Sequence, residues 1–125
     1  MRLFADTANM DELKKMDAMG ILEGITTNPT IASQAGKSLR DTLEKLSREF
    51  PDIEVFGQVV AKDTAGMVEE ARKINGAGKH IVVKIPCTPQ GLAAVKILVK
   101  EEIHVCVTAV LTAAEAYLCA VAGAD

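Results

Sequence analysis

Short apolar segments typical of β-strands begin near residues 2, 24, 54, 80 and 104 of this chain. Each segment is followed by a stretch with the apolar spacing of an amphipathic helix, so one strand and one helix recur about every 25 residues. Strands that alternate with helices in this way form parallel sheets. The pattern therefore predicts an α/β fold, and the length of 125 residues predicts that residues 1–125 form one domain.

Residues that favour helix ends support this division of the chain. Asn9 followed by Glu12 resembles a capping box. Ser38 is expected to cap the next helix, and Thr88 followed by Pro89 combines an N-cap with proline at the first helical position. Helices are expected over residues 9–19, 38–50, 64–75, 88–100 and 112–122. Strands are expected over residues 2–6, 24–27, 54–60, 80–86 and 104–110.

Two architectures are built from repeated βα units. Eight units close into a (β/α)8 barrel and need about 200 residues, whereas five units form a flavodoxin-like doubly wound sheet. Length alone favours the doubly wound sheet. A phosphoacceptor receiver domain, which has that fold, is disfavoured because the third expected strand is followed by no carboxylate before Asp63. Such a domain needs an acidic pocket that holds Mg²⁺.

The segment from His80 to Pro86 places one charged residue, Lys84, inside an otherwise apolar strand. A parallel strand covered on both faces is expected to be a continuous run of Val and Ile. An ammonium group taken out of water is destabilised relative to the neutral amine. A neutral lysine amine can form a Schiff base with a carbonyl substrate. On this segment alone, the alternative is an edge strand whose lysine extends to solvent.

Polar side chains occur near the carboxyl end of every expected strand. Side chains alternate between the two faces of a sheet, so residues of equal parity in one strand share a face. Active sites of parallel α/β folds are built at the carboxyl ends of the strands. The sequence therefore predicts a functional site at that end of the sheet. Its candidate residues, in chain order, are Asp6, Thr26, Asn28, Gln58, Lys84 and Thr108.

Composition excludes several classes of partner. Apolar residues make up 49% and charged residues 25% of the chain, as in ordinary globular domains. The net charge of -3 and the scarcity of aromatic residues argue against a nucleic-acid partner. No uncharged apolar run is long enough to cross a membrane, and the amino terminus does not resemble a signal peptide. We therefore expect neither a nucleic-acid nor a membrane partner.

The cysteines and histidines predict no metal site. The three cysteines are odd in number and lack CxxC spacing, which fits core thiols in a reducing compartment. We therefore expect a cytoplasmic protein. His80 and His104 each precede an expected strand, and neither has a carboxylate spaced as a metal partner.

The ordered motifs of the chain resemble those of the small transaldolases, and within them the fructose-6-phosphate aldolase-like branch. The resemblance extends over the whole chain. It rests on four motifs in order, namely Phe4–Asn9, Gly24–Thr30, Val82–Pro86 followed by Thr88–Gly91, and Thr108–Val110 leading to Ala122–Gly123.

The resemblance implies a parallel (β/α)8 TIM barrel of the class I aldolase type, of which this chain would hold about five βα units. It implies that Lys84 forms a Schiff base with a ketose or a dihydroxyacetone unit. Asp6 would assist proton transfer and hold the hydroxyl groups of the donor. Asn28, with Thr26 nearby, would orient the donor or the lysine. No cofactor is implied.

Gln58 and Thr108 point to the aldolase branch of the family. The sequence also resembles transaldolases proper, but these have Glu at the position of Gln58. In them this Glu positions the catalytic water. Gln58 could hold that water, with Thr108 as the second anchor. The resemblance therefore favours cleavage or transfer of a dihydroxyacetone unit from a sugar phosphate, and the alternative is transfer from sedoheptulose 7-phosphate to glyceraldehyde 3-phosphate. A homo-oligomer is expected.

The chain departs from the family in length, because the family continues for about three further βα units. Five units leave two unpaired sheet edges and an uncovered core. Three interpretations remain open. The chain is a fragment of a longer protein, it associates with a second chain that completes the barrel, or it is an inactive half-barrel that only self-associates.

Overall fold

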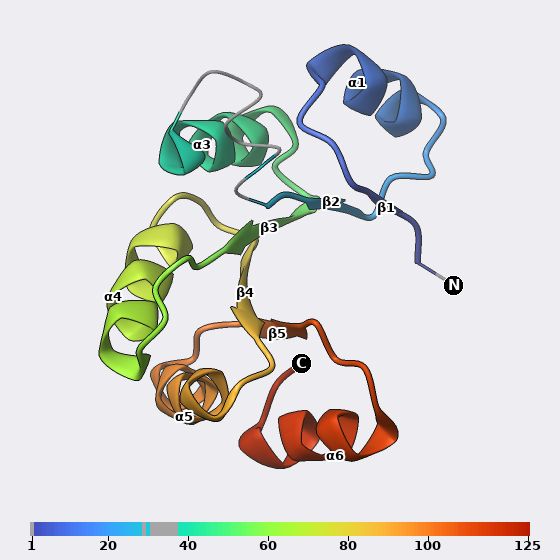
Figure 1. The fold of residues 1–125 in the computed structure, drawn as a ribbon. Helices are drawn as coiled ribbons and strands as arrows, with labels where there is room; N and C mark the ends of the chain where they lie inside the picture. The colour runs from blue at the N-terminus through green and yellow to red at the C-terminus, as the bar shows by residue number, and fades with distance from the viewer. Residues whose placement is uncertain (1, 29, 31–37) are drawn as a thin grey trace.

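The structure is a computed structural model that describes residues 2–28, 30 and 38–125. Five parallel strands form one sheet, and neighbouring strands in the sheet are also neighbours in the chain. The sheet curves, and the helices lie along its convex side (Figure 1). The strands are β1 (Phe4–Ala5), β2 (Gly24–Thr26), β3 (Glu54–Gln58), β4 (Ile81–Pro86) and β5 (Val105–Thr108).

Helices follow the strands in strict alternation. They are α1 (Met10–Ala18), α3 (Leu39–Glu49), α4 (Thr64–Asn75), α5 (Pro89–Leu98) with the short 3-10 helix η1 (Val99–Glu101), and α6 (Ala113–Ala122). The N-caps predicted at Asn9, Ser38 and Thr88 are confirmed, since each side chain accepts hydrogen bonds from the first turn of its helix. Each cap satisfies backbone N–H groups that have no partner within the helix.

The strand order identifies the sheet as part of a barrel wall. A doubly wound sheet reverses its direction of growth and carries helices on both faces. Here the order is β1-β2-β3-β4-β5, every pair is parallel, and the helices lie on one side. The expectation drawn from length alone, a flavodoxin-like sheet, is therefore wrong. The chain forms a partial TIM barrel of five βα units.

One hydrophobic core fills the space between the sheet and the helices. Along β4, Ile81, Val83 and Ile85 are buried in this core, whereas the alternating residues Val82 and Lys84 point to the opposite, concave face. The strand residues of the core are Ala5, Ile25, Val55, Ile81, Val83, Ile85 and Val105, and the main helix residues are Leu13, Leu43, Leu46, Met67, Ala71, Ile74, Ala94, Val95 and Leu98.

Gly57 allows two helices to approach the middle of the sheet closely. A Cβ atom built at Gly57 would lie 2.6 Å from Cδ1 of Leu43 in α3 and 2.9 Å from Cγ2 of Ile74 in α4. Both distances are shorter than a normal carbon contact, so any side chain there would push the helices outward. The close packing of α3 and α4 on β3 therefore depends on the absence of a side chain at position 57.

The amino-terminal part of the concave face is apolar. The ring of Phe4 lies against Gly24, where a Cβ atom would come within 2.6 Å of it. The centroids of the Phe4 and Phe56 rings are 5.3 Å apart. Phe56 is 6% exposed, whereas Phe4 is 37% exposed at the open edge of the sheet. These rings fill the concave face below the polar residues at the strand ends.

The strands expected over residues 2–6 and 104–110 are shorter in the structure, at Phe4–Ala5 and Val105–Thr108, and two further local predictions differ from it. The strand expected to reach Val60 ends at Gln58, because the backbone N–H groups of Val60 and Ala61 bond to the Glu70 carboxylate and leave the ladder. The capping box expected at the start of α1 is incomplete. The Asn9 side chain caps the helix, but the Glu12 carboxylate accepts its hydrogen bond from the Thr7 hydroxyl.

Candidate active site

Lys84 lies on the concave face between two residues of the adjacent strands. In the β3–β4 register Lys84 is opposite Gln58, and in the β4–β5 register it is opposite Cys106. Residues opposite each other in parallel strands point to the same face. The side chains of Gln58, Lys84 and Cys106 therefore form one row across β3, β4 and β5.

Asp6 and Thr26 form a second polar pair on the same face. The Thr26 hydroxyl donates a hydrogen bond of 2.8 Å to Oδ1 of Asp6. Asp6 is exposed and follows directly after β1, so its carboxylate lies at the carboxyl end of the sheet. Two strands separate β1 from β4, so Asp6 and Lys84 face a shared space without being neighbours in the sheet.

Thr108 ends β5 one step beyond the row of Lys84. It is opposite Pro86 in the sheet register, and its carbonyl accepts a hydrogen bond of 2.9 Å from the backbone N–H of Cys87. The next residue, Ala109, has φ of 61° in the left-handed region. This conformation turns the chain away from the sheet at once and leaves Thr108 as the last polar group of the strand.

Asn28 follows β2 and is partly buried. The preceding residue, Thr27, is fully buried, and its hydroxyl donates a hydrogen bond of 2.7 Å to the Phe56 carbonyl. Thr27 thereby anchors the segment that carries Asn28 to β3. Pro29, which belongs to the same predicted motif, lies outside the described residues.

Lys84 is only partly buried, whereas a strand covered on both faces would bury it fully. Its backbone is well inside the sheet, because Val83 and Ile85 on either side are completely inaccessible to solvent. The Lys84 side chain is less buried than Val83 and Ile85 because it lies on the concave face. Among the described residues, no opposite wall covers that face. In that part of the chain no ion pair involves the Lys84 amine.

Cys106 is the site neighbour that sequence reasoning missed. Its expected role was that of a core thiol, yet it is half-buried on the concave face beside Lys84. Burial raises the pKa of the Cys106 thiol, and the positive charge of Lys84 acts in the opposite direction. The signal was present in the sequence, since Cys106 has the same strand parity as Thr108 and lies just before it.

Two cavities border the end of β3. One of about 160 Å³ is lined by Leu39, Arg40, Gln58, Val60, Glu70, Lys73 and Ile74, on the outer side near α3 and α4. A larger one of about 330 Å³ lies at the carboxyl ends of β3 and β4, where its lining includes Gln58, Pro86, Thr88 and Gln90. Gln58 borders both cavities.

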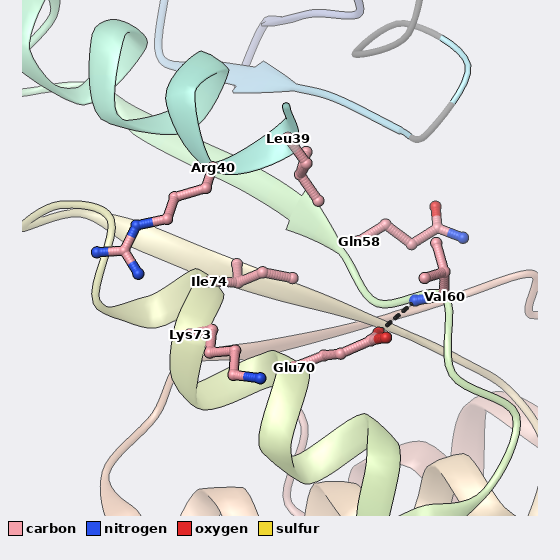
Figure 2. Close-up of a pocket in the computed structure, with 7 residues that line it drawn as sticks. All are labelled: Leu39, Arg40, Gln58, Val60, Glu70, Lys73 and Ile74. Atoms are coloured by element: carbon pink, nitrogen blue, oxygen red, sulfur yellow. Dashed lines mark hydrogen bonds between the residues drawn. The ribbon is translucent and has the colours of Figure 1, made fainter. Parts of the chain in front are cut away.

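Glu70 holds the turn that follows Gln58. Its Oε2 atom accepts hydrogen bonds from the backbone N–H groups of Val60 at 2.7 Å and Ala61 at 3.0 Å. Figure 2 shows the Glu70 carboxylate extending from α4 to Val60, just past the end of β3. This charge-assisted contact fixes the position at which β3 ends.

Neither a metal site nor a membrane span is found in the part of the chain that the structure describes. None of those residues forms a group of three or more His, Cys, Asp or Glu side chains that could hold a metal ion. Over the same residues, no helix has both the length and the apolar character needed to cross a membrane.

Fold and site together define a class of protein. It is an α/β protein whose parallel sheet is part of a TIM barrel, with a lysine on β4 opposite Gln58 of β3 and Cys106 of β5. The chain belongs to the transaldolase/fructose-6-phosphate aldolase family, whose family model matches residues 3–125. The family resemblance predicted from the sequence motifs is thus confirmed.

Three curated relatives have the name probable transaldolase. The relative from Clostridium kluyveri is 42% identical over 125 residues, which cover 100% of this chain and 58% of the relative. The relative from Kosmotoga olearia is 43% identical over 124 residues, or 99% and 56% of the two chains. The relative from Methanococcus maripaludis is 40% identical over 125 residues, or 100% and 58%. This chain therefore spans less than two thirds of the length of these relatives.

Proposed function

We propose that the protein is a class I aldolase or transaldolase in which Lys84 forms a Schiff base with the ketone of a dihydroxyacetone unit. The neutral amine attacks the carbonyl carbon, and loss of water gives an iminium ion. The iminium withdraws electrons from the adjacent carbon–carbon bond. Cleavage of that bond releases an aldehyde and leaves an enamine on Lys84, which is then protonated or attacks a second aldehyde.

The polar residues around Lys84 have separate roles in this proposal. Asp6 moves a proton between the substrate hydroxyl group and water, and the Thr26 hydroxyl keeps its carboxylate oriented through the 2.8 Å hydrogen bond. Gln58 and Thr108 hold the water that protonates the enamine or hydrolyses the iminium. Asn28 orients the donor. Each of these residues lies at, or one or two residues beyond, the carboxyl end of its strand.

The observation that carries the proposal is the register of β3, β4 and β5. In this register Lys84 of β4 has Gln58 and Cys106 directly opposite it in the neighbouring strands. A lysine inside a parallel sheet, flanked by hydrogen-bonding groups and facing the barrel interior, is suited to covalent catalysis at a carbonyl carbon. Family membership supports the same chemistry.

The substrate class in this proposal is a sugar phosphate or free dihydroxyacetone. Gln58 favours the aldolase reaction, because a neutral amide cannot act as the general base that transfer chemistry uses at this position. The names of the curated relatives favour the transaldolase reaction instead. Release of free dihydroxyacetone from fructose 6-phosphate distinguishes the two, because only the cleavage reaction produces it.

We also propose that the protein acts in the cytoplasm as a homo-oligomer. Free thiols at Cys87, Cys106 and Cys119 suit a reducing compartment. Leu111, in the loop before α6, is 86% exposed, and Tyr117, within α6, is 70% exposed, which provides apolar surface for association.

A matched pair of lysine variants tests the proposed chemistry. Lys84→Arg keeps the positive charge but cannot form a Schiff base, so the rate of fructose 6-phosphate cleavage should fall to background. Lys96→Arg, at an exposed position of α5, should leave the rate unchanged. Cleavage that survives in Lys84→Arg, in a protein with unchanged circular dichroism, would exclude Lys84 as the nucleophile.

A further inference from the structure

Two cysteine thiols from distant parts of the chain meet next to the candidate active site. Sγ of Cys87 and Sγ of Cys119 are 3.8 Å apart, although the two residues are 32 positions apart in the sequence. Cys87 lies between the end of β4 and Thr88, the N-cap of α5, and Cys119 lies in α6. At this distance the sulfur atoms are in direct contact, with no space for another atom between them.

The backbone around both cysteines is fixed. The N–H of Cys87 donates a 2.9 Å hydrogen bond to the carbonyl of Thr108, which joins this turn to β5. The α6 helix starts at a complete capping box, in which Thr112 and Glu115 satisfy each other's backbone groups. The backbone of Cys87 is thus held against β5, and the helix that carries Cys119 begins at a capped N-terminus.

We propose that Cys87 and Cys119 are a site of reversible covalent modification, at which a peroxide oxidises the pair to an intramolecular disulfide. This proposal does not depend on the proposed aldolase activity. The S–S bond of a disulfide is near 2.05 Å long. From 3.8 Å, the two sulfur atoms must therefore move about 2 Å closer to each other. Small rotations about the Cα–Cβ bonds of two residues already in contact can supply that movement.

The reaction proceeds in two balanced steps. The Cys87 thiolate attacks one oxygen of hydrogen peroxide, the O–O bond breaks, and hydroxide leaves and is protonated to water. Cys87 is then a sulfenic acid. The Cys119 sulfur attacks the Cys87 sulfur, the S–S bond forms, the S–O bond breaks, and a second water leaves. The two thiols together lose two electrons and two protons, and the peroxide is reduced to two waters.

Cys87 is the first residue to react in this scheme because of its exposure. Cys87 is half-buried and open to a small oxidant, whereas Cys119 is only 7% exposed and serves as the resolving thiol. Burial, the neighbouring Cys119 thiol and the charge of Glu115 raise the pKa of Cys87. The thiolate that reacts with peroxide is therefore scarce at neutral pH, and a mildly alkaline buffer accelerates the test reaction.

The disulfide would connect the turn after β4 to α6 around the outside of β5. Lys84 lies three residues before Cys87, so the bond would restrain the chain next to the candidate active site. It would also close a loop of 32 residues. A cross-link of this kind stabilises a protein mainly by restricting its unfolded state, and it should raise the melting temperature by roughly 10 °C.

The test treats the purified full-length protein with hydrogen peroxide at mildly alkaline pH, followed by intact mass measurement and non-reducing peptide mapping. We expect a loss of about 2 Da, which is two hydrogen atoms, and one cross-linked peptide joining Cys87 to Cys119. Dithiothreitol should restore the original mass and melting temperature. Cys87→Ser and Cys119→Ser should abolish the mass loss, whereas Cys106→Ser should retain it.

Three results would overturn the proposal. The first is an unchanged mass after treatment, and the second is a cross-link that contains Cys106. The third is oxidation of Cys87 to sulfinic acid without any cross-link, since it would show that Cys119 does not react with the sulfenic acid before a second peroxide does. The Cys106→Ser variant keeps the test valid if either of the other variants folds poorly.

Discussion

Lys84 has a different environment from the exposed lysines of the helices. Its backbone is enclosed by the completely buried residues Val83 and Ile85, while its side chain lies on the concave face beside Gln58 and Cys106. The sheet register thus supplies both the rigid attachment and the neighbours that covalent catalysis needs. A lysine on a helix surface, such as Lys96, has neither.

Replacement of Asp6 by Asn tests its role in proton transfer. The amide can still accept the hydrogen bond from Thr26, so the position of the side chain should be preserved. It cannot move a proton, and kcat should fall by about 10²- to 10⁴-fold with a much smaller change in KM. Asp11→Asn, in the exposed first turn of α1, is the control and should leave both constants unchanged. Equal kcat values for the two variants would contradict the role of Asp6.

Replacement of Gln58 by Glu should shift the reaction from cleavage towards transfer. The family resemblance gives Glu at this position in transaldolases proper, so the variant carries the ionisable residue of the transferase branch. The measured quantity is the ratio of free dihydroxyacetone to transfer product when an aldehyde acceptor is present. Asn75→Asp, at the last residue of α4 and outside the lining of both cavities, controls for the added charge. An unchanged ratio in the Gln58 variant would remove the basis for assigning this residue to the water.

At the scale of the elements, predictions from sequence succeeded where local chemistry decides the structure. The N-caps at Asn9, Ser38 and Thr88 depend only on residues within one turn, and all three were correct. The end of β3 depends on Glu70, which lies in the following helix and reaches back to the Val60 amide. Contacts of this kind between elements cannot be recognised from the sequence around the strand end alone.

The Gly57→Ala variant tests how closely the helices pack on β3. The added methyl group would meet Leu43 and Ile74 at 2.6 and 2.9 Å, so the helices must shift. We expect the free energy of unfolding to fall by about 1–3 kcal/mol. Gly76→Ala is the matched control, because a Cβ atom there would lie at least 3.5 Å from its nearest neighbours, and φ of Gly76 is -72°. Urea denaturation of both proteins measures the difference, and equal stabilities would contradict the close contact.

The Glu70→Ala variant tests whether the turn after Gln58 is held from α4. The variant leaves the N–H groups of Val60 and Ala61 without their carboxylate partner, and unfolding should become easier by about 2 kcal/mol. Amide exchange at Val60 and Ala61 should also accelerate. Glu69→Ala, which removes only an exposed ion pair with Lys73, should change little. Identical amide exchange in both variants would show that Glu70 does not hold the turn.

At the scale of the whole molecule, the sequence rhythm predicted the parallel sheet correctly, but length alone predicted the wrong architecture. Repeated βα units are compatible with both a doubly wound sheet and a barrel, and only the position of the helices relative to the sheet separates them. The motifs shared with a barrel family identified the correct one, and the sequential strand order agrees.

The burial of Lys84 could not be predicted from its own strand. A strand covered on both faces and a strand of an open barrel wall have the same apolar sequence, but they differ in what lies opposite the concave face. Here the core is confined to the helix side, so Lys84 is half-buried, and Phe4 is 37% exposed. The burial of the concave face depends on all strands of a barrel. The chain spans 58% of the length of the relative from Clostridium kluyveri.

The most direct test of the account is borohydride reduction of the full-length protein in the presence of dihydroxyacetone, followed by peptide mapping. Reduction converts a Schiff base into a stable secondary amine on the lysine that formed it. The account predicts one adduct, on Lys84, which is present in the Lys96→Arg variant and absent from Lys84→Arg. An adduct on a different lysine, or none in a protein that cleaves fructose 6-phosphate, would contradict it.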